Sequence, residues 1–198
     1  MTEIERVRRV LAGWRPVEAL AAGTLPAAVA VILHEMQDGG GIEALFIKRA
    51  ERAGDPWSGQ VAFPGGRREP TDADLLATAI RETREEVGID LRSATLLGAL
   101  DDHAPRTPTL PPVVVRPFVF AVLERPSLEL DGEVQRAFWV PFSRLAEPGV
   151  YRDITLSIRG TPRTFPAYQL GDDVIWGMTE RIVTGFVELL KDAQRRRG

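Results

Sequence analysis

The chain has 198 residues, 44% of them hydrophobic and 27% charged, and a formal net charge of -3 at pH 7. This length suits one domain with a substantial core, and the net charge argues against a broad basic surface for nucleic acid. The absence of cysteine excludes disulfides and thiolate metal sites. Neither an apolar leader nor a membrane-length apolar run is visible. We therefore expect one soluble, cytoplasmic domain over residues 1–198, with no nucleic-acid or membrane partner.

The N-terminal half begins with an expected helix over residues 1–13, where Ile4, Val7 and Leu11 recur at helical spacing. Two apolar runs of strand length follow, "AAVAVILHE" and "EALFIKR". The intervening "MQDGGG" is a turn signal, so these runs predict a β-hairpin.

The middle of the chain contains a third short strand, "QVAFPGG", and then a helix that includes "AIRETREEVGID". Thr71 or Asp72 is the expected N-cap of this helix, because both residue types accept hydrogen bonds from free backbone N–H groups. Gly88 stands where a left-handed residue commonly ends a helix.

The C-terminal half contains three predicted strands, a hairpin and a helix. The strands are "ATLLGAL", "VVVRPFVFAVLE" and "RAFWVPF", and the proline-rich "DDHAPRTPTLPP" forms a loop between the first two. "ITLSIRGTPRTFPAYQL" predicts a hairpin that turns at Gly160 and Thr161. A final helix is expected over residues 175–192, with Trp176 in its apolar stripe. This order of elements predicts a layered α/β (α+β) domain.

Three glutamates, Glu82, Glu85 and Glu86, lie on one stripe of the middle helix, because spacings of three and four residues share a face. Their mutual repulsion is unfavourable unless a cation offsets it. Mg²⁺ or Mn²⁺ would do so, since hard divalent cations take carboxylate and phosphate oxygens. The alternative is a solvated acidic face. Arg81 is placed to pair with Glu85, four residues later.

Residues 81–89, "RETREEVGI", follow a glycine pair and resemble the R-E-U-x-E-E-x-G-U end of the Nudix box. Thr83 replaces an aliphatic residue of that pattern. Upstream, Ala73 stands where the general box has a glutamate, which leaves Asp72 or Asp74 to fill the acidic role. The whole box spans residues 65–89.

Gly66 is one residue further from Arg81 than the general box requires, and this expansion resembles the branch of Nudix hydrolases that acts on coenzyme A. The signature of that branch before the box is also recognisable. Its matching residues in this chain are Leu45, Arg49, Gly59 and Phe63-Pro64-Gly65-Gly66. Asp55 departs from the signature, which has a second arginine at this position.

The resemblance implies a Nudix-type α-β-α sandwich with a mixed central β-sheet. It also implies hydrolysis of a nucleoside diphosphate linked to another moiety, a small-molecule substrate that would be coenzyme A or an acyl derivative. The same chemistry on ADP-ribose, NADH or a nucleotide sugar is the alternative. Outside enzymes, the alternative is a nucleotide-sensing binding module. A homodimer is an additional expectation.

The resemblance also implies roles for the residues of the box. Glu82, Glu85 and Glu86 would bind Mg²⁺ or Mn²⁺ with the carbonyl group of Gly65. Glu82 and Glu85 would act in catalysis, and Arg81 would hold the glutamates in place.

Other candidates lie outside the helix. "DGEVQRAFWVP" resembles a Nudix stretch that supplies a further ligand or base, which nominates Glu133 as general base; an ordinary loop glutamate is the alternative. Arg49, Arg52 and Arg67 are candidate phosphate-binding residues, because guanidinium groups bind phosphate bidentately. Arg49 is the preferred candidate because it matches the signature, whereas a solvated surface position is favoured for Arg52 and Arg67.

Overall fold

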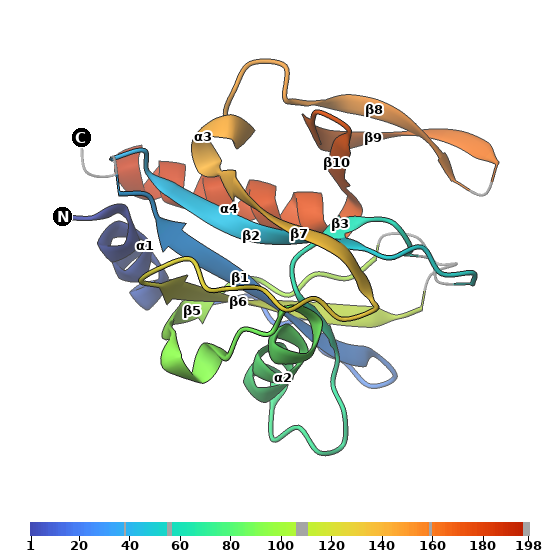
Figure 1. Cartoon of the computed structure of the whole chain (residues 1–198), viewed down its shortest axis with the longest axis horizontal. Helices are drawn as coiled ribbons and strands as arrows, with labels where there is room; N and C mark the ends of the chain where they lie inside the picture. Colours follow the sequence, from blue (N-terminus) through green and yellow to red (C-terminus); the bar gives the residue numbers. More distant parts are fainter. Residues whose placement is uncertain (38, 55–56, 106–110, 159, 196–198) are drawn as a thin grey trace.

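The computed structural model describes residues 1–37, 39–54, 57–105, 111–158 and 160–195 (Figure 1). The elements before the middle of the chain are α1 Glu3–Ala12, β1 Leu25–Glu35, β2 Ile42–Arg49, β3 Val61–Ala62, β4 Gly65–Arg67, α2 Leu75–Val87 and the 3₁₀ turn Leu91–Ser93. The later elements are β5 Thr95–Ala99, β6 Val113–Val122, β7 Val134–Pro141, α3 Phe142–Leu145, β8 Tyr151–Ile158, β9 Thr161–Leu170, β10 Asp173–Trp176 and α4 Gly177–Arg195.

The centre of the fold is a seven-stranded mixed sheet. Its strands follow the order β3-β2-β1-β6-β5, with β4 paired to β1 and β7 paired to β2. The pair β1–β6 is parallel, whereas β1 and β2 form the antiparallel hairpin predicted from their apolar runs. The mixed central sheet of the predicted fold class is therefore confirmed.

Helices cover both faces of this sheet, as the predicted sandwich requires (Figure 1). Alternate residues of β1 point to opposite faces, because side chains alternate along a strand. Val31 and Leu33 pack in a core with α1 and α4, while Ala30 and Ile32 pack in a core that includes Val87 of α2. The α2 helix thus lies on one face, opposite the two terminal helices.

The segment "QVAFPGG", expected as one strand, forms two short ones. β3 pairs with β2, and β4 pairs with β1 through Val29 and Gly65. Gly65 has φ +150°, and a Cβ atom there would lie 2.2 Å from the carbonyl oxygen of Ala28. Only glycine allows β4 to approach β1 this closely. The change of partner at Pro64 brings the start of the box onto the central strand.

The α2 helix ends at Gly88 as predicted, but its N-cap is neither Thr71 nor Asp72. Asp74 is the N-cap, and its side chain accepts a hydrogen bond from the backbone of Ala77 at 2.8 Å. Asp72 is unavailable as a cap because its carboxylate binds side chains of the helix. Gly88 has φ +76°, the left-handed conformation expected at this position.

The C-terminal third forms a second, three-stranded sheet with the order β10-β9-β8. The predicted hairpin is confirmed as β8 and β9, which lie on either side of the expected turn. The expectation for Trp176 was wrong: it lies in β10, and the final helix begins at Gly177. Pairing of Trp176 with Ala167 of β9 decides this, and a single sequence does not reveal that contact.

Two further expectations concern the whole chain. Within the described ranges, none of the helices has the length and apolar character needed to cross a bilayer. The organisation of residues 1–198 as a single domain stays a prediction. The proline-rich loop contains residues 106–110, which lie outside the described part of the structure.

Candidate active site

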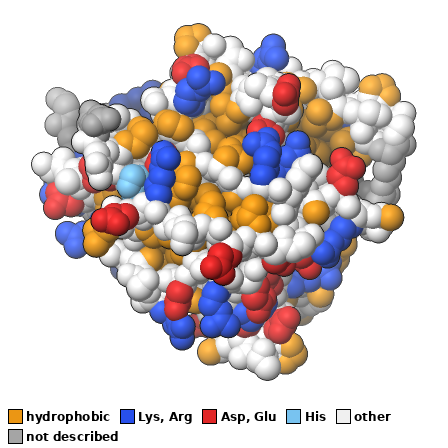
Figure 2. All heavy atoms as spheres, in the orientation of Figure 1, with side chains coloured by type: hydrophobic (Ala, Val, Ile, Leu, Met, Phe, Trp, Pro, Cys, Tyr) orange, Lys and Arg blue, Asp and Glu red, His pale blue; other side chains and the backbone are white. Residues whose placement is uncertain are grey.

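Arg81 of α2 is the centre of a cluster of carboxylates from the helix and from the loop before it. Figure 2 shows acidic and basic side chains side by side in the lower part of this face. Arg81 Nη1 lies 2.9 Å from Glu85 Oε2 and 3.0 Å from Glu82 Oε1. Its Nε and Nη2 each donate to Asp72 at 2.9 Å. The predicted pairing with Glu85 is therefore present, and of the two aspartates considered for the acidic role, Asp72 is the one that contacts Arg81.

Asp72 fixes this arginine from a buried position. Its side chain also accepts hydrogen bonds from Thr78 Oγ1 and from the backbone N–H of Glu69, both at 2.9 Å. Arg81, first, and then these other donors hold the pKa of Asp72 well below its usual range, against the opposing effect of burial. A fully ionised carboxylate therefore anchors Arg81 to the loop before the helix.

Glu86 is buried, with only 4% of its surface exposed, and does not lie on an open acidic stripe. Its Oε2 accepts a hydrogen bond from the backbone N–H of Gly65 at 2.8 Å, and its Oε1 lies 3.7 Å from Arg49 Nη1. Burial raises the pKa of Glu86 to about 8, because the Gly65 bond and Arg49 offset only part of the desolvation. The positive charge around Glu86 is therefore insufficient to keep its carboxylate ionised at pH 7.

Glu82 lies directly against the glycine pair. A Cβ atom added to Gly66 would stand 2.5 Å from the carboxylate carbon of Glu82, so the absence of a side chain makes room for this group. Burial raises the pKa of Glu82 despite the opposing charge of Arg81, and the charges of Glu85 and Glu133 raise it further. The charge of Glu82 also raises the pKa of Glu86.

A bound divalent cation would offset both the lost hydration and the mutual repulsion of these two carboxylates. Both are desolvated oxygen donors, and Mg²⁺ and Mn²⁺ prefer such ligands. Within the described residues, however, no three His, Asp or Glu side chains form a ready group for one ion. Glu85, half exposed, is turned to Arg81. Its part in metal binding stays a prediction, as does that of the Gly65 carbonyl.

Glu133 comes from the connection between β6 and β7 and reaches the same region. Its Oε1 lies 3.0 Å from Arg52 Nη1, and both side chains are about half exposed. The backbone N–H of Glu133 donates to Asp131 Oδ1 at 2.8 Å, which closes a tight turn. The structure thus brings the predicted general base and one predicted phosphate-binding arginine into contact.

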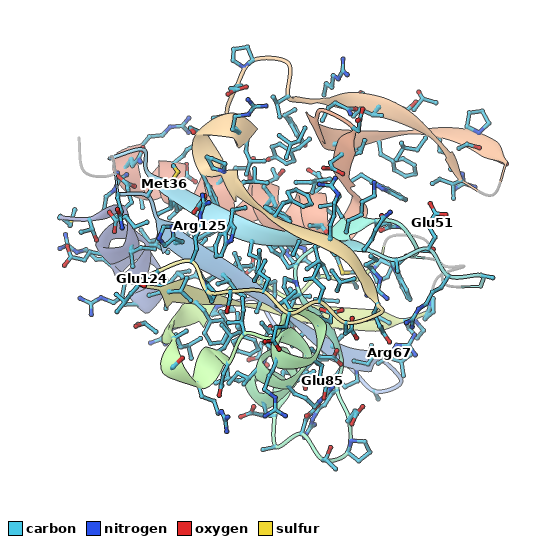
Figure 3. The ribbon with its side chains drawn as sticks, in the orientation of Figure 1. Met36, Glu51, Arg67, Glu85, Glu124 and Arg125 are labelled. Atoms are coloured by element: carbon cyan, nitrogen blue, oxygen red, sulfur yellow. The ribbon has the colours of Figure 1, made fainter. Side chains whose placement is uncertain are left out.

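The three candidate arginines differ in their surroundings. Arg49 is largely buried beside Glu86, and Arg52 pairs with Glu133. Arg67 is exposed at the end of β4 (Figure 3), and its backbone carbonyl accepts a hydrogen bond from Arg81 at 3.1 Å. Asp55, the departure from the coenzyme A signature, lies outside the described residues.

Asp131 belongs to the site although it was not among the predicted residues. Its backbone N–H donates to the carbonyl oxygen of Glu86 at 3.2 Å, and its charge helps to raise the pKa of Glu86. The only local signal was its place in the turn "DGE" just before Glu133. Such a turn is typical of many loops and does not indicate proximity to a helix.

Comparison with known proteins gives relatives over most of the chain. It is 34% identical over 190 residues to the mitochondrial coenzyme A diphosphatase NUDT8 of Homo sapiens, covering 93% of this chain and 77% of that protein. It is 41% identical over 130 residues to an uncharacterized protein of Schizosaccharomyces pombe, covering 63% of this chain and 40% of that protein. The Nudix hydrolase NudL of Photorhabdus laumondii is 36% identical, and the match covers 64% of this chain and 66% of NudL.

Solved structures share the fold at low sequence identity. A MutT/nudix family protein from Enterococcus faecalis superposes with a TM-score of 0.57 at 23% identity, covering 87% of this chain and 64% of that one. A Nudix hydrolase from M. smegmatis, RenU, gives a TM-score of 0.51 at 20% identity, and the match covers 66% of this chain and 81% of RenU. The NUDIX domain model matches residues 24–157, which contain the whole carboxylate cluster. The chain belongs to the Nudix family, with the features of its coenzyme A pyrophosphatase branch.

Proposed function

We propose that this protein is a Mg²⁺- or Mn²⁺-dependent pyrophosphohydrolase that cleaves the P–O–P bond of coenzyme A or an acyl derivative. The observation that carries the proposal is the pair of desolvated carboxylates on α2, Glu82 and Glu86, which lie against Gly66 and Gly65 of β4. If Glu82 and Glu86 served only the stability of the fold, apolar side chains of similar size would serve it as well or better. Desolvated carboxylates at both positions therefore indicate a functional role.

Glu82 and Glu86 would hold the cation, with Glu85 and the Gly65 carbonyl as further predicted ligands. When bound, the cation supplies positive charge that neutralises the diphosphate oxygens and polarises the reacting phosphorus. Arg81 keeps Glu82 and Glu85 in place through its anchor on Asp72. The charge distribution of the site is therefore complementary to a diphosphate only when the cation is present.

Glu133 would accept the proton of the attacking water. The water oxygen then bonds to phosphorus, the bond from phosphorus to the bridging oxygen breaks, and the departing phosphate takes the electron pair. Arg49 and Arg52 would contact phosphate oxygens, and their ion pairs with Glu86 and Glu133 support this role. Arg67 is proposed for the outer part of the same contact, because it is exposed beside the helix.

Two observations support coenzyme A as the substrate. The human relative, matched over 93% of this chain, is a coenzyme A diphosphatase. The segment from Leu45 to Gly66 also has the spacing of the coenzyme A branch. ADP-ribose, NADH and nucleotide sugars are the competing substrates for the same bond cleavage.

The test is a substrate panel with the full chain. Coenzyme A, acetyl-coenzyme A, ADP-ribose, NADH and a nucleotide sugar are incubated with Mg²⁺ or Mn²⁺, and the products are separated by chromatography. We expect 3′,5′-ADP and phosphopantetheine from coenzyme A, and no product after EDTA treatment. Faster turnover of another compound would overturn the substrate assignment. Nucleotide binding without any hydrolysis would identify a binding module.

A further inference from the structure

A charged cluster around a buried carboxylate lies at the opposite end of the sheet from Arg67. The carboxylate of Glu43 is fully buried, and both of its oxygens accept hydrogen bonds from the guanidinium group of Arg125. His34 Nδ1 lies 2.8 Å from Glu43 Oε1. Arg125 also stands over the ring of Trp139, with its Cζ 5.9 Å from the ring centroid. None of these residues belongs to the site described above.

Through Arg125, this cluster attaches the start of the connection between β6 and β7 to Glu43 of β2. In Figure 1 the connection, residues 123–133 in yellow, crosses the front of the molecule from the end of β6 to the start of β7. Figure 3 shows Arg125 near Met36, away from Glu85 and Arg67. Glu133 closes the far end of the same connection, so the segment links the cluster to the carboxylates of α2.

Besides Arg125, the connection is held by Leu128, which packs against the core under α2. At its far end, the backbone N–H of Ala50 donates to the carbonyl oxygen of Glu133 at 2.8 Å, and Arg52 pairs with the Glu133 side chain. Every residue from 123 to 133 is at least partly exposed, and Leu123 is 98% exposed. Its backbone touches the helix end at two points, from Glu129 N to Val87 O at 3.0 Å and from Asp131 N to Glu86 O at 3.2 Å. Single backbone hydrogen bonds at a surface are weak constraints. A bidentate pair with a fully buried carboxylate is a much stronger one, because opening it leaves that charge without its partner.

We propose that Arg125, through its ion pair with Glu43, is a positioning residue for Glu133. The inference rests on the proposed role of Glu133 as the proton acceptor. Arg125 fixes where the connection leaves the sheet, and the two backbone contacts then guide it along the end of α2. The position of the Glu133 side chain relative to Glu82 is thereby fixed. Arg125 touches no part of the reaction site and acts only through this connection.

The test is a double-mutant cycle with Arg125→Ala and Glu133→Gln, because a cycle isolates the coupling of two residues. Turnover is measured with coenzyme A and, in parallel, with ADP-ribose. We expect Arg125→Ala to lower kcat about tenfold and to change KM less than about twofold, since misplacement of a general base affects the chemical step. In the Glu133→Gln background, Arg125→Ala should cause no further loss.

Two matched variants separate positioning from a general loss of structure. Arg144 is 55% exposed and pairs with the exposed Glu147, so Arg144→Ala is the control for Arg125, which is 53% exposed. It should retain wild-type turnover. Arg125→Lys keeps the charge but lacks the bidentate fork, and it should recover part of kcat. Hydrogen exchange of residues 126–133 should accelerate in Arg125→Ala, whereas exchange within α2 should not.

The outcomes distinguish this inference from the proposed function. An equal loss from Arg125→Ala in both backgrounds, an unchanged kcat, or unchanged exchange in residues 126–133 would overturn the inference alone. Full activity of Glu133→Gln would remove both the proton acceptor and the inference. Failure of the wild type to hydrolyse either compound would contradict the proposed function, and the exchange measurement would still decide whether Arg125 fixes the connection.

Discussion

Asp72 and Arg81 form a bidentate ion pair in which Nε and Nη2 of the arginine each donate to one carboxylate oxygen at 2.9 Å. The pair joins the loop before α2 to the middle of the helix. Arg81 then uses Nη1 to contact Glu82 and Glu85. The orientation of the Glu82 and Glu85 carboxylates consequently depends on a residue outside the helix.

Asp72→Asn should destabilise the protein at pH 7 by about 1–3 kcal/mol, because a buried charged hydrogen bond is lost. The wild-type pKa of Asp72 is depressed, so its contribution is present above the unfolded pKa near 4 and disappears as the pH falls through the folded pKa. The difference in the free energy of unfolding between wild type and Asp72→Asn should therefore shrink in acid. Urea denaturation at pH 7 and at pH 3 measures this, and an equal deficit at both would contradict the assignment.

Gly66→Ala should lower kcat/KM at least about tenfold with little change in Tm. The new Cβ would meet the flexible end of Glu82 at 2.5 Å, so the side chain must move while the backbone remains in place. Gly185→Ala in α4 is the control, since a Cβ there meets nothing within 4 Å. Unchanged activity of Gly66→Ala would show that the position of Glu82 does not matter.

Glu86 should make the metal-free protein less stable as the pH rises. Burial raises its pKa to about 8 in the folded state, so the folded protein binds the proton more tightly between about pH 4.5 and 8. Unfolding stability should fall over this window, by an amount on the order of a few kcal/mol, and Glu86→Gln should remove the slope. Denaturation curves in EDTA at pH 5, 6.5 and 8 would show it. Parallel profiles of the two proteins would refute it.

Mg²⁺ should restore the stability that the metal-free protein loses as the pH rises. At pH 8 the ion binds the folded wild type and stabilises it by mass action, whereas Glu86→Gln should show a much smaller rise in Tm. Equal rises would place the binding elsewhere.

Thr83→Val should stabilise the protein by about 1 kcal/mol, or a few degrees in Tm. Thr83 is fully buried, and among the described residues no hydrogen-bond partner lies within reach of its hydroxyl. Thr78 is equally buried but donates to Asp72, so Thr78→Val should be destabilising. Calorimetry of the two variants tests the contrast, and a loss of Tm in Thr83→Val would indicate a hidden partner.

The sequence by itself determined the family, the mixed sheet between helices and the place of the box helix. Helix geometry is local, so the spacing of Glu82, Glu85 and Glu86 was sufficient to put them on neighbouring positions and to pair Arg81 with Glu85. The left-handed end at Gly88 was equally local. These features follow from residues a few positions apart.

Only the tertiary structure decided which of these groups are buried and which distant residues they contact. Gly65 reaches Glu86 across 21 positions, and Arg52 reaches Glu133 across 81. The burial that raises the pKa of Glu86 comes from such distant segments. Because desolvation and ion pairing depend on what the rest of the chain brings to a side chain, periodicity predicted where the carboxylates lie but not which of them is buried.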